Sequence, residues 1–157
     1  MSGNLDEKEI VVAKAGQARD YPDGIPECGV DALRFALLAY TSQGRDINLD
    51  VLRVQGYRFF CNKIWQAVRF TLNQFAEKDQ KPQFNIDASK TSPTNKWILS
   101  KLARAVKETN EGLKTYNFTN ATTVTYNFWL YDFCDVYIEA IKPVLYGDNA
   151  AARQDAI

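Results

Sequence analysis

Cations and amides recur at helical spacing between residues 51 and 76, and these side chains are the ones whose types could do chemistry. The segment holds four positive residues and no acidic one, in a chain whose 19 Lys and Arg balance 19 Asp and Glu. At about 100° per residue, steps of three and four place six polar side chains on one helical stripe: Gln55, Arg58, Asn62, Gln66, Arg69 and Asn73. Because guanidinium groups neutralise phosphates and amides hydrogen-bond base edges, the stripe has the chemistry of a single-stranded RNA surface.

Two phenylalanines lie beside this stripe. Phe59 and Phe70 project along its edge, far from the centre of the helix's own apolar side, and a flat ring can stack on an unstacked base. The predicted RNA-binding residues are Arg58, Asn62, Gln66, Arg69 and Phe70. The alternative is that another helix covers both rings and that the polar stripe is ordinary solvent-facing surface.

Other residue types form no catalytic or metal-ligating constellation in this sequence. The chain contains no histidine, and Cys28, Cys61 and Cys134 lie far apart without a CxxC pair, which argues against a zinc site or an activated thiol. The glycines are scattered and form no phosphate-cradling loop. We therefore predict no catalytic residue and no metal site.

A row of carboxylates lies on one face of a later predicted helix, at Asp132, Asp135 and Glu139. Such a row could suggest a divalent cation or an acid–base pair. Along a straight helix, however, the three groups spread over roughly 10 Å, which is too far to converge on one ion. We expect them to pair with lysines or arginines of a neighbouring helix.

Composition places the chain among globular proteins with a real core. Hydrophobic residues make up 46% and aromatic residues 13% of its 157 residues, which excludes a disordered chain, and the length excludes two large domains. No apolar run approaches the roughly 20 residues that span a bilayer, and the N-terminal residues are polar and acidic, unlike a signal peptide. We expect no membrane association and a cytoplasmic location.

The elements that must position the stripe are predicted to be helices. The apolar side of the long helix over residues 51–76 repeats at steps of three and four, with Val54, Tyr57, Cys61, Ile64, Trp65, Val68, Leu72 and Phe75. Asn48 or Asp50 is placed to cap its start. A short helix begins at Asp31, and its many apolar residues predict burial on most sides.

Two more long helices are predicted in the C-terminal half. One covers about residues 95–115 with Thr94 or Asn95 as its cap, and the other runs from about 119 to 145 and ends at Gly147. The remaining segments are a weak helical pattern at 5–18, a loop at 20–29, a brief strand or turn at 45–50, a polar connection at 79–95 and the start of a further helix at 149–157.

Five blocks of this sequence, in this order, resemble the valyl-tRNA synthetases of eukaryotic cytosolic type. They are DGIPECGVDALRFAL (23–37), AYTSQGRDINLD (39–50), GYRFFCNKIWQAVRF (56–70), WILSKL (97–102) and FWLYDFCDVYIE (128–139). In the family the first block follows the lysine-rich KMSKS signature loop. The resemblance covers nearly everything from residue 19 to 146, and the related enzymes for leucine, isoleucine and methionine diverge at several of these blocks.

The resemblance implies a fragment of an enzyme that activates valine with ATP and Mg²⁺ and esterifies it to its tRNA. The family's histidine-containing ATP signature is impossible in a chain without histidine, and the KMSKS loop is absent as well. We therefore expect no cofactor in this fragment and no catalysis by the fragment alone.

The resemblance also implies a mainly α fold, an antiparallel helical bundle of the class Ia anticodon-binding type. Residues 1–50 correspond to the end of the catalytic region with a small stem-contact-like segment, and residues 51–157 to the helical anticodon-binding domain, incomplete at its C-terminus. The block 56–70 lies where the family's anticodon pocket forms. Gln66 departs from the Asn of many relatives, which lengthens the side chain but keeps its donor and acceptor.

The expected partners are valine tRNA, contacted at its anticodon arm, and the rest of the synthetase. The competing hypothesis is a structural helical module that makes interdomain or protein contacts and has no RNA affinity of its own. Because the family's helical domain continues beyond Ile157, we also expect exposed apolar surface that allows self-association, with side chains from the set Trp97, Leu102, Val106, Phe128 and Trp129.

Overall fold

The computed structural model describes residues 6–41, 46–76, 89, 91–149 and 152, and every regular element that these residues form is a helix. The helices are α1 (Glu7–Asp20), α2 (Val30–Tyr40), α3 (Val51–Ala76), α4 (Pro93–Lys114), α5 (Phe118–Asn127), the π-helix η2 (Phe128–Tyr137) and α6 (Ile138–Tyr146). The fold is mainly α, as predicted. Most of the expected connection at 79–95 and of the expected helix start at 149–157 lies outside the described residues.

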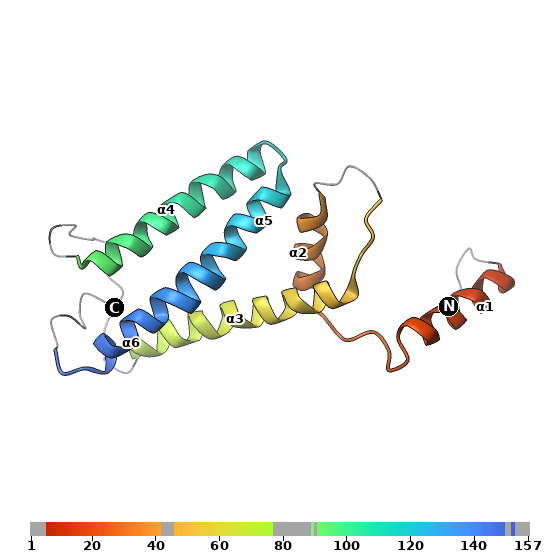
Figure 1. Cartoon of the computed structure of the whole chain (residues 1–157), viewed down its shortest axis with the longest axis horizontal. Helices are drawn as coiled ribbons and strands as arrows, with labels where there is room; N and C mark the ends of the chain where they lie inside the picture. The colour runs from red at the N-terminus through yellow and green to blue at the C-terminus, as the bar shows by residue number, and fades with distance from the viewer. Residues whose placement is uncertain (1–5, 42–45, 77–88, 90, 150–151, 153–157) are drawn as a thin grey trace.

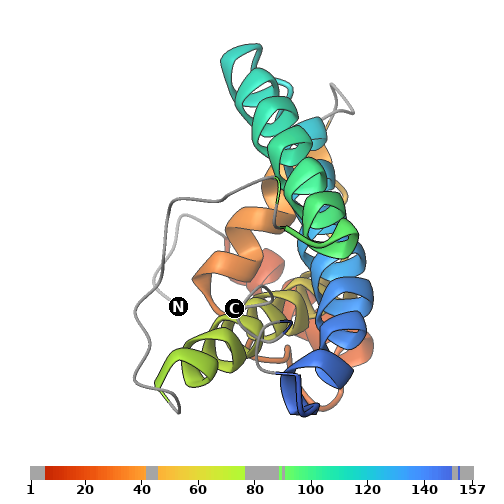
Figure 2. The ribbon, with the colours of Figure 1, turned by 90° about the vertical axis from the view of Figure 1, so that its left-hand side faces the viewer.

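Figure 1 shows α4 running antiparallel to the continuous rod formed by α5, η2 and α6. The two lie close together at Gly112, where an added Cβ would be 3.0 Å from the Asn117 carbonyl oxygen and 3.1 Å from the Ala121 Cβ. Helix α3 crosses this pair and meets the rod towards its α6 end, whereas α1 stands apart and buries no residue. Figure 2 shows α3 beside the pair of α4 and the rod, not between them.

The start of α3 agrees with the predicted cap. The Leu52 amide donates to Asp50 Oδ1 at 2.9 Å, which satisfies one of the donors that a helix start leaves unpaired. The preceding residues 46–50 form no regular element, so the strand alternative for 45–50 finds no support in its described part. None of the helices in the described ranges has the length and apolar character needed to cross a membrane.

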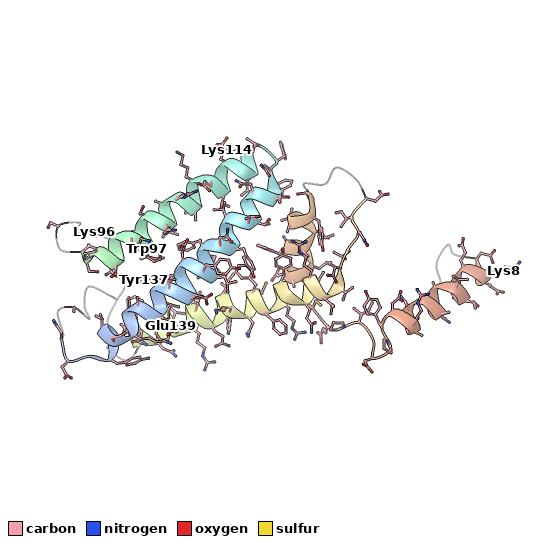
Figure 3. All side chains as sticks on the ribbon, in the orientation of Figure 1. Lys8, Lys96, Trp97, Lys114, Tyr137 and Glu139 are labelled. Atoms are coloured by element: carbon pink, nitrogen blue, oxygen red, sulfur yellow. The ribbon has the colours of Figure 1, made fainter. Side chains whose placement is uncertain are left out.

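The start of α4 differs from the prediction. Ser92, not Thr94 or Asn95, is the cap: its Oγ accepts from the Asn95 amide at 3.3 Å. The reason is Pro93, whose fixed φ and missing N–H suit the first helical position, so the helix begins earlier than expected. Asn95 is instead buried, and its Oδ1 accepts a hydrogen bond from the Tyr137 hydroxyl at 2.9 Å. This bond ties the start of α4 to the end of η2, where Figure 3 shows Tyr137.

The third long helix is continuous as predicted, but its middle is a π-helix. Residues 128–137 form i→i+5 hydrogen bonds. In this segment Phe133 stacks on both Phe128 and Tyr137, at ring centroid distances of 6.2 Å and 5.8 Å. The helical spacing of apolar residues could not reveal this, because α and π hydrogen bonds differ in span by only one residue.

The core lies mainly between α4 and the rod. Its buried members are Ile98 and Ala105 of α4 with Phe128, Tyr137, Ile141 and Leu145. A second cluster joins Ala32 and Ala36 of α2 to Val54 of α3, and a third joins Ala67 of α3 to Cys134 and Ile138. Helix α3 is therefore attached at two places, to α2 near its start and to η2 and α6 further along.

Three burial predictions are wrong. Helix α2 is buried on one side only, since Leu33, Leu37 and Leu38 stay exposed while Ala32 and Ala36 face α3. On α3, Trp65 is 69% and Leu72 59% exposed. The α3 residues that are buried instead recur every six or seven positions, because α2 and the rod cover only a narrow seam of the helix: Val54, Phe60, Ala67 and Gln74.

The third correction concerns the face expected to remain uncovered. Phe128 is buried within the chain because it packs against Ile98 and Ala105 in the antiparallel pair. Leu102 and Val106 are exposed as expected, and Trp97 and Trp129 are half-buried against the core. The exposed apolar surface on this side is therefore smaller than the five residues suggested.

Candidate functional site

The predicted polar stripe lies on the open side of α3. Arg58, Asn62, Gln66 and Arg69 are all exposed, because the covered seam runs along the opposite side of the helix. In the described part of the chain none of the four forms an ion pair or a side-chain hydrogen bond. Two guanidinium groups and two amides are therefore accessible to an external partner.

The other two cations of α3 are engaged within the chain. Lys63 Nζ lies 2.7 Å from Asp135 Oδ1 of η2, and this hydrogen bond raises the pKa of Lys63. The Arg53 guanidinium lies 4.8 Å from the centroid of the Tyr40 ring, and hydrogen bonding with the Tyr40 side chain raises its pKa. The charge excess that the sequence showed is thus divided between internal contacts and an exposed pair, Arg58 and Arg69.

A groove of about 540 Å³ runs between α3 and the junction of η2 and α6. Its α3 wall includes three predicted site residues, Asn62, Gln66 and Phe70, and the structure therefore brings these together. Arg58 and Arg69 do not line it. The other lining residues are Phe59, Lys63, Ala67, Cys134, Asp135, Ile138, Glu139 and Lys142, and Figure 3 shows Glu139 where the rod passes α3.

The two candidate phenylalanines differ in their surroundings. Phe70 is half-buried and packs against two core clusters that include residues of the rod, so the rod covers part of its ring. Phe59 is 63% exposed at the groove wall. The ring that is more available for an external contact is Phe59, which lay beside the stripe in sequence but was not among the predicted site residues.

Trp65 is a third exposed ring that the sequence prediction placed on the wrong side. It lies seven residues after Arg58 and four before Arg69, and these spacings put the three side chains on one helical face. The spacing was the available signal. It was outweighed by the assumption that a tryptophan at an apolar helical step is buried.

Two of the three carboxylates in the row pair with lysines of neighbouring helices, as predicted, whereas the third, Glu139, does not. Asp135 pairs with Lys63 of α3, and Asp132 with Lys101 of α4 at 3.1 Å. Glu139 pairs with Lys142 on its own helix. At the groove floor, burial raises the pKa of the Cys134 thiol, which keeps this sulfur protonated and unreactive at neutral pH.

The chain is similar to one family of enzymes over its whole length. Residues 95–157 match the model of the anticodon-binding domain of tRNA ligase. All of the chain is 76% identical to a valine–tRNA ligase of Caenorhabditis elegans, of which it covers 15%, and 97% of it is 52% identical to that of Rattus norvegicus, of which it covers 12%. A mitochondrial valine–tRNA ligase of Homo sapiens is 49% identical over 92% of the chain.

The chain thus spans only 12% to 15% of the length of these first relatives. No solved structure matches it significantly. The identity extends across α1, α2 and α3 as well as the part matched by the domain model. The chain therefore belongs to the valyl-tRNA synthetase family, as a segment that includes residues of its anticodon-binding domain.

Proposed function

We propose that the chain binds the anticodon arm of valine tRNA, as part of an enzyme that activates valine with ATP and Mg²⁺ and charges that tRNA. The observation that carries the proposal is the open side of α3, where Arg58 and Arg69 have no counter-charge in the described residues and flank the amides of Asn62 and Gln66. Phosphates need cations without internal partners, and base edges need free donors and acceptors. The similarity to valine–tRNA ligases supports this assignment.

The roles of the predicted residues follow from their positions. Arg58 and Arg69 would contact phosphates, because they lie outside the groove on the exposed face. Asn62 and Gln66 would hydrogen-bond a base at the groove wall, and Phe70 would offer the uncovered part of its ring to that base. ATP and Mg²⁺ would be held by other parts of the enzyme.

We further propose that residues 51–157 form the helical anticodon-binding domain and residues 1–50 the end of the catalytic region with a stem-contact-like segment. The packing of Ala67 against Cys134 and Ile138 supports the inclusion of α3, although the family match begins only at residue 95. Helix α2 also packs on α3 through Ala32 and Ala36. A cytoplasmic location is proposed on the same resemblance, and imaging of the tagged protein would distinguish it from a mitochondrial one.

The test is titration of the 157-residue chain with valine tRNA and with an anticodon-altered variant over a series of salt concentrations. We expect weaker binding of the variant, and a logarithm of the association constant that falls linearly with the logarithm of salt, because phosphate contacts release counterions. Equal affinity for both RNAs would contradict anticodon recognition. No salt-dependent binding at all would favour the structural module.

The structural module is the second candidate because α3 also exposes apolar surface. Trp65, Val68 and Leu72 are exposed at steps of three and four and therefore share one face of the helix. Such a face can dock another part of the synthetase or a second copy of the chain, and Leu102 and Val106 offer a smaller apolar area on α4. Sedimentation over a concentration series tests self-association, and a strictly monomeric chain at high concentration would contradict it.

A further inference from the structure

A second cleft lies between α2, α3 and α5, and it shares no lining residue with the groove described above. Its volume is about 400 Å³. Arg53 is the one charged residue among the described residues that line it, and hydroxyl and amide side chains make up most of the polar remainder, with Tyr57, Thr123, Tyr126 and Asn127 prominent. A cleft with one cation, several neutral donors and no carboxylate favours an anion.

The charge of Arg53 is oriented but not neutralised. Its guanidinium lies over the Tyr40 ring at 4.8 Å from the centroid, and its hydrogen-bonding neighbours are the phenols of Tyr40 and Tyr57. Phenols are uncharged near neutral pH, and no ion pair reaches Arg53 within the described chain. The contact with the ring holds the planar guanidinium group in place, and its positive charge remains unneutralised at the edge of the cleft.

Gly56 lies in the α3 wall of this cleft, and no contact among the described residues requires a glycine there. It lies inside a 26-residue helix, where glycine is less favourable than any residue except proline. Its φ is not positive, and a Cβ added to it would meet no atom within 4 Å. Gly112 shows the contrast, because there a Cβ would lie only 3.0 Å from the Asn117 carbonyl oxygen and 3.1 Å from Ala121 of α5. The missing side chain at Gly56 therefore leaves space for something outside the chain to approach the α3 backbone.

Two further donors line this cleft on α5. Thr123 and Asn127 lie four residues apart on α5, so their side chains are neighbours on one face, and both are exposed. Neither forms a side-chain hydrogen bond in the described residues. The hydroxyl of Thr122, by contrast, is already bonded to the carbonyl of Phe118. A guanidinium fork together with a hydroxyl and an amide is a suitable donor set for phosphate oxygens.

We propose that this cleft binds a backbone phosphate of RNA, held by Arg53, Thr123 and Asn127, with Gly56 admitting the sugar–phosphate chain to the surface of α3. The proposal rests on the RNA-binding function proposed above. RNA is favoured over an acidic peptide because α3 also carries Arg58 and Arg69, which have no counter-charge in the described residues. Arg58 lies about 7.5 Å further along the helix axis than Arg53 and about 140° around it. A strand crossing α3 could therefore meet the cleft and the groove in turn.

The test uses two separate variants of the 157-residue chain, Arg53→Gln and Gly56→Ala. Each is titrated with valine tRNA at several salt concentrations. Arg53→Gln should weaken binding about tenfold and reduce the slope of log K against log salt by about 0.7 to 0.9, since one phosphate contact is lost. Gly56→Ala should raise the melting temperature by about 3 °C through better helix propensity, yet weaken RNA binding several-fold. A residue with a purely structural role would not combine higher stability with weaker binding.

The matched controls are Gly16→Ala in α1, another helical glycine whose added Cβ meets nothing, and Arg104→Gln in α4, whose guanidinium is paired with Glu108. Both should leave RNA affinity within about twofold of the wild type. Arg53→Lys should keep the salt slope but lose affinity, because the charge remains while the fork is lost. Near-ultraviolet circular dichroism confirms that each variant is folded.

The possible outcomes distinguish the proposal for the cleft from the proposal that the chain binds valine tRNA. If the wild-type chain does not bind tRNA, both proposals are overturned. If it binds tRNA and the Arg53 and Gly56 variants behave like the controls, only the cleft proposal is overturned. Titration with inorganic phosphate and with polyglutamate adds two arms: Arg53-dependent binding of either probe, with unchanged affinity for RNA, would assign the cleft to a small anion or an acidic peptide and overturn the RNA assignment.

Discussion

Phe70→Ala should reduce both the stability of the chain and its affinity for valine tRNA, and the structure allows the two losses to be estimated separately. Complete removal of a buried phenylalanine ring costs about 3 to 5 kcal/mol. Phe70 is half-buried and packs against two core clusters, so we expect about 2 to 3 kcal/mol of lost unfolding free energy. The loss of base stacking on the part of the ring that faces the groove should weaken RNA binding by about 1 to 3 kcal/mol.

Phe70→Leu and Phe70→Tyr distinguish the two contributions. Leucine keeps most of the apolar contacts with the two core clusters but has no flat face, so stability should fall by only about 1 kcal/mol while RNA binding falls by about 1 to 2 kcal/mol. Tyrosine keeps the ring and should be nearly silent in binding. Phe59→Ala is the matched control for stability: this ring is 63% exposed, so its loss should cost less than about 1 kcal/mol of unfolding free energy.

Urea unfolding gives the stability of each variant, and fluorescence anisotropy with labelled valine tRNA gives the affinity, at a temperature where every variant is folded. We expect Phe70→Leu to lose more binding free energy than unfolding free energy, whereas Phe59→Ala should lose less than about 1 kcal/mol of unfolding free energy. If Phe70→Leu binds RNA as well as the wild type, the ring is only a packing element. Equal affinity losses for Phe70→Ala and Phe70→Tyr would lead to the same conclusion.

Three further predictions concern activity, phosphate contacts and an ion pair. The 157-residue chain alone should show no aminoacylation and no ATP–pyrophosphate exchange; exchange above background would contradict this. Arg58→Gln and Arg69→Gln should each lower the salt slope of tRNA binding by about 0.7 to 0.9, and unchanged slopes would place both guanidinium groups outside the interface. Asp135→Asn should cost less than about 1 kcal/mol of stability, because both partners of the Lys63 pair are 45% exposed. The pKa of Lys63 is raised in the folded chain. The stability contributed by the ion pair should therefore be complete below pH of about 10.4 and disappear as pH rises through the folded pKa. Urea unfolding of the wild type and of Asp135→Asn at neutral and alkaline pH measures this.

Much of the fold could be predicted because helical periodicity and caps are local properties of the chain. The apolar steps of α3, the Asp50 cap and the end of the third helix at Gly147 depend on residues within a few positions of each other. The cap of α4 was missed although its signal is also local: Pro93 at the first helical position indicates Ser92. The π segment was missed for a different reason, since the spacing of its apolar residues fits α and π hydrogen bonding alike.

The sequence by itself determined that the chain is helical, that α3 carries cations and amides on one stripe without acidic residues, and which family the blocks resemble. Only the tertiary structure decided which side of α3 is covered, because burial depends on where α2 and the rod cross the helix and not on its own apolar pattern. That crossing leaves Trp65 exposed, half-covers Phe70 and joins Lys63 to Asp135, a residue 72 positions away. It also forms the groove and the Arg53 cleft, whose walls come from segments far apart in the chain.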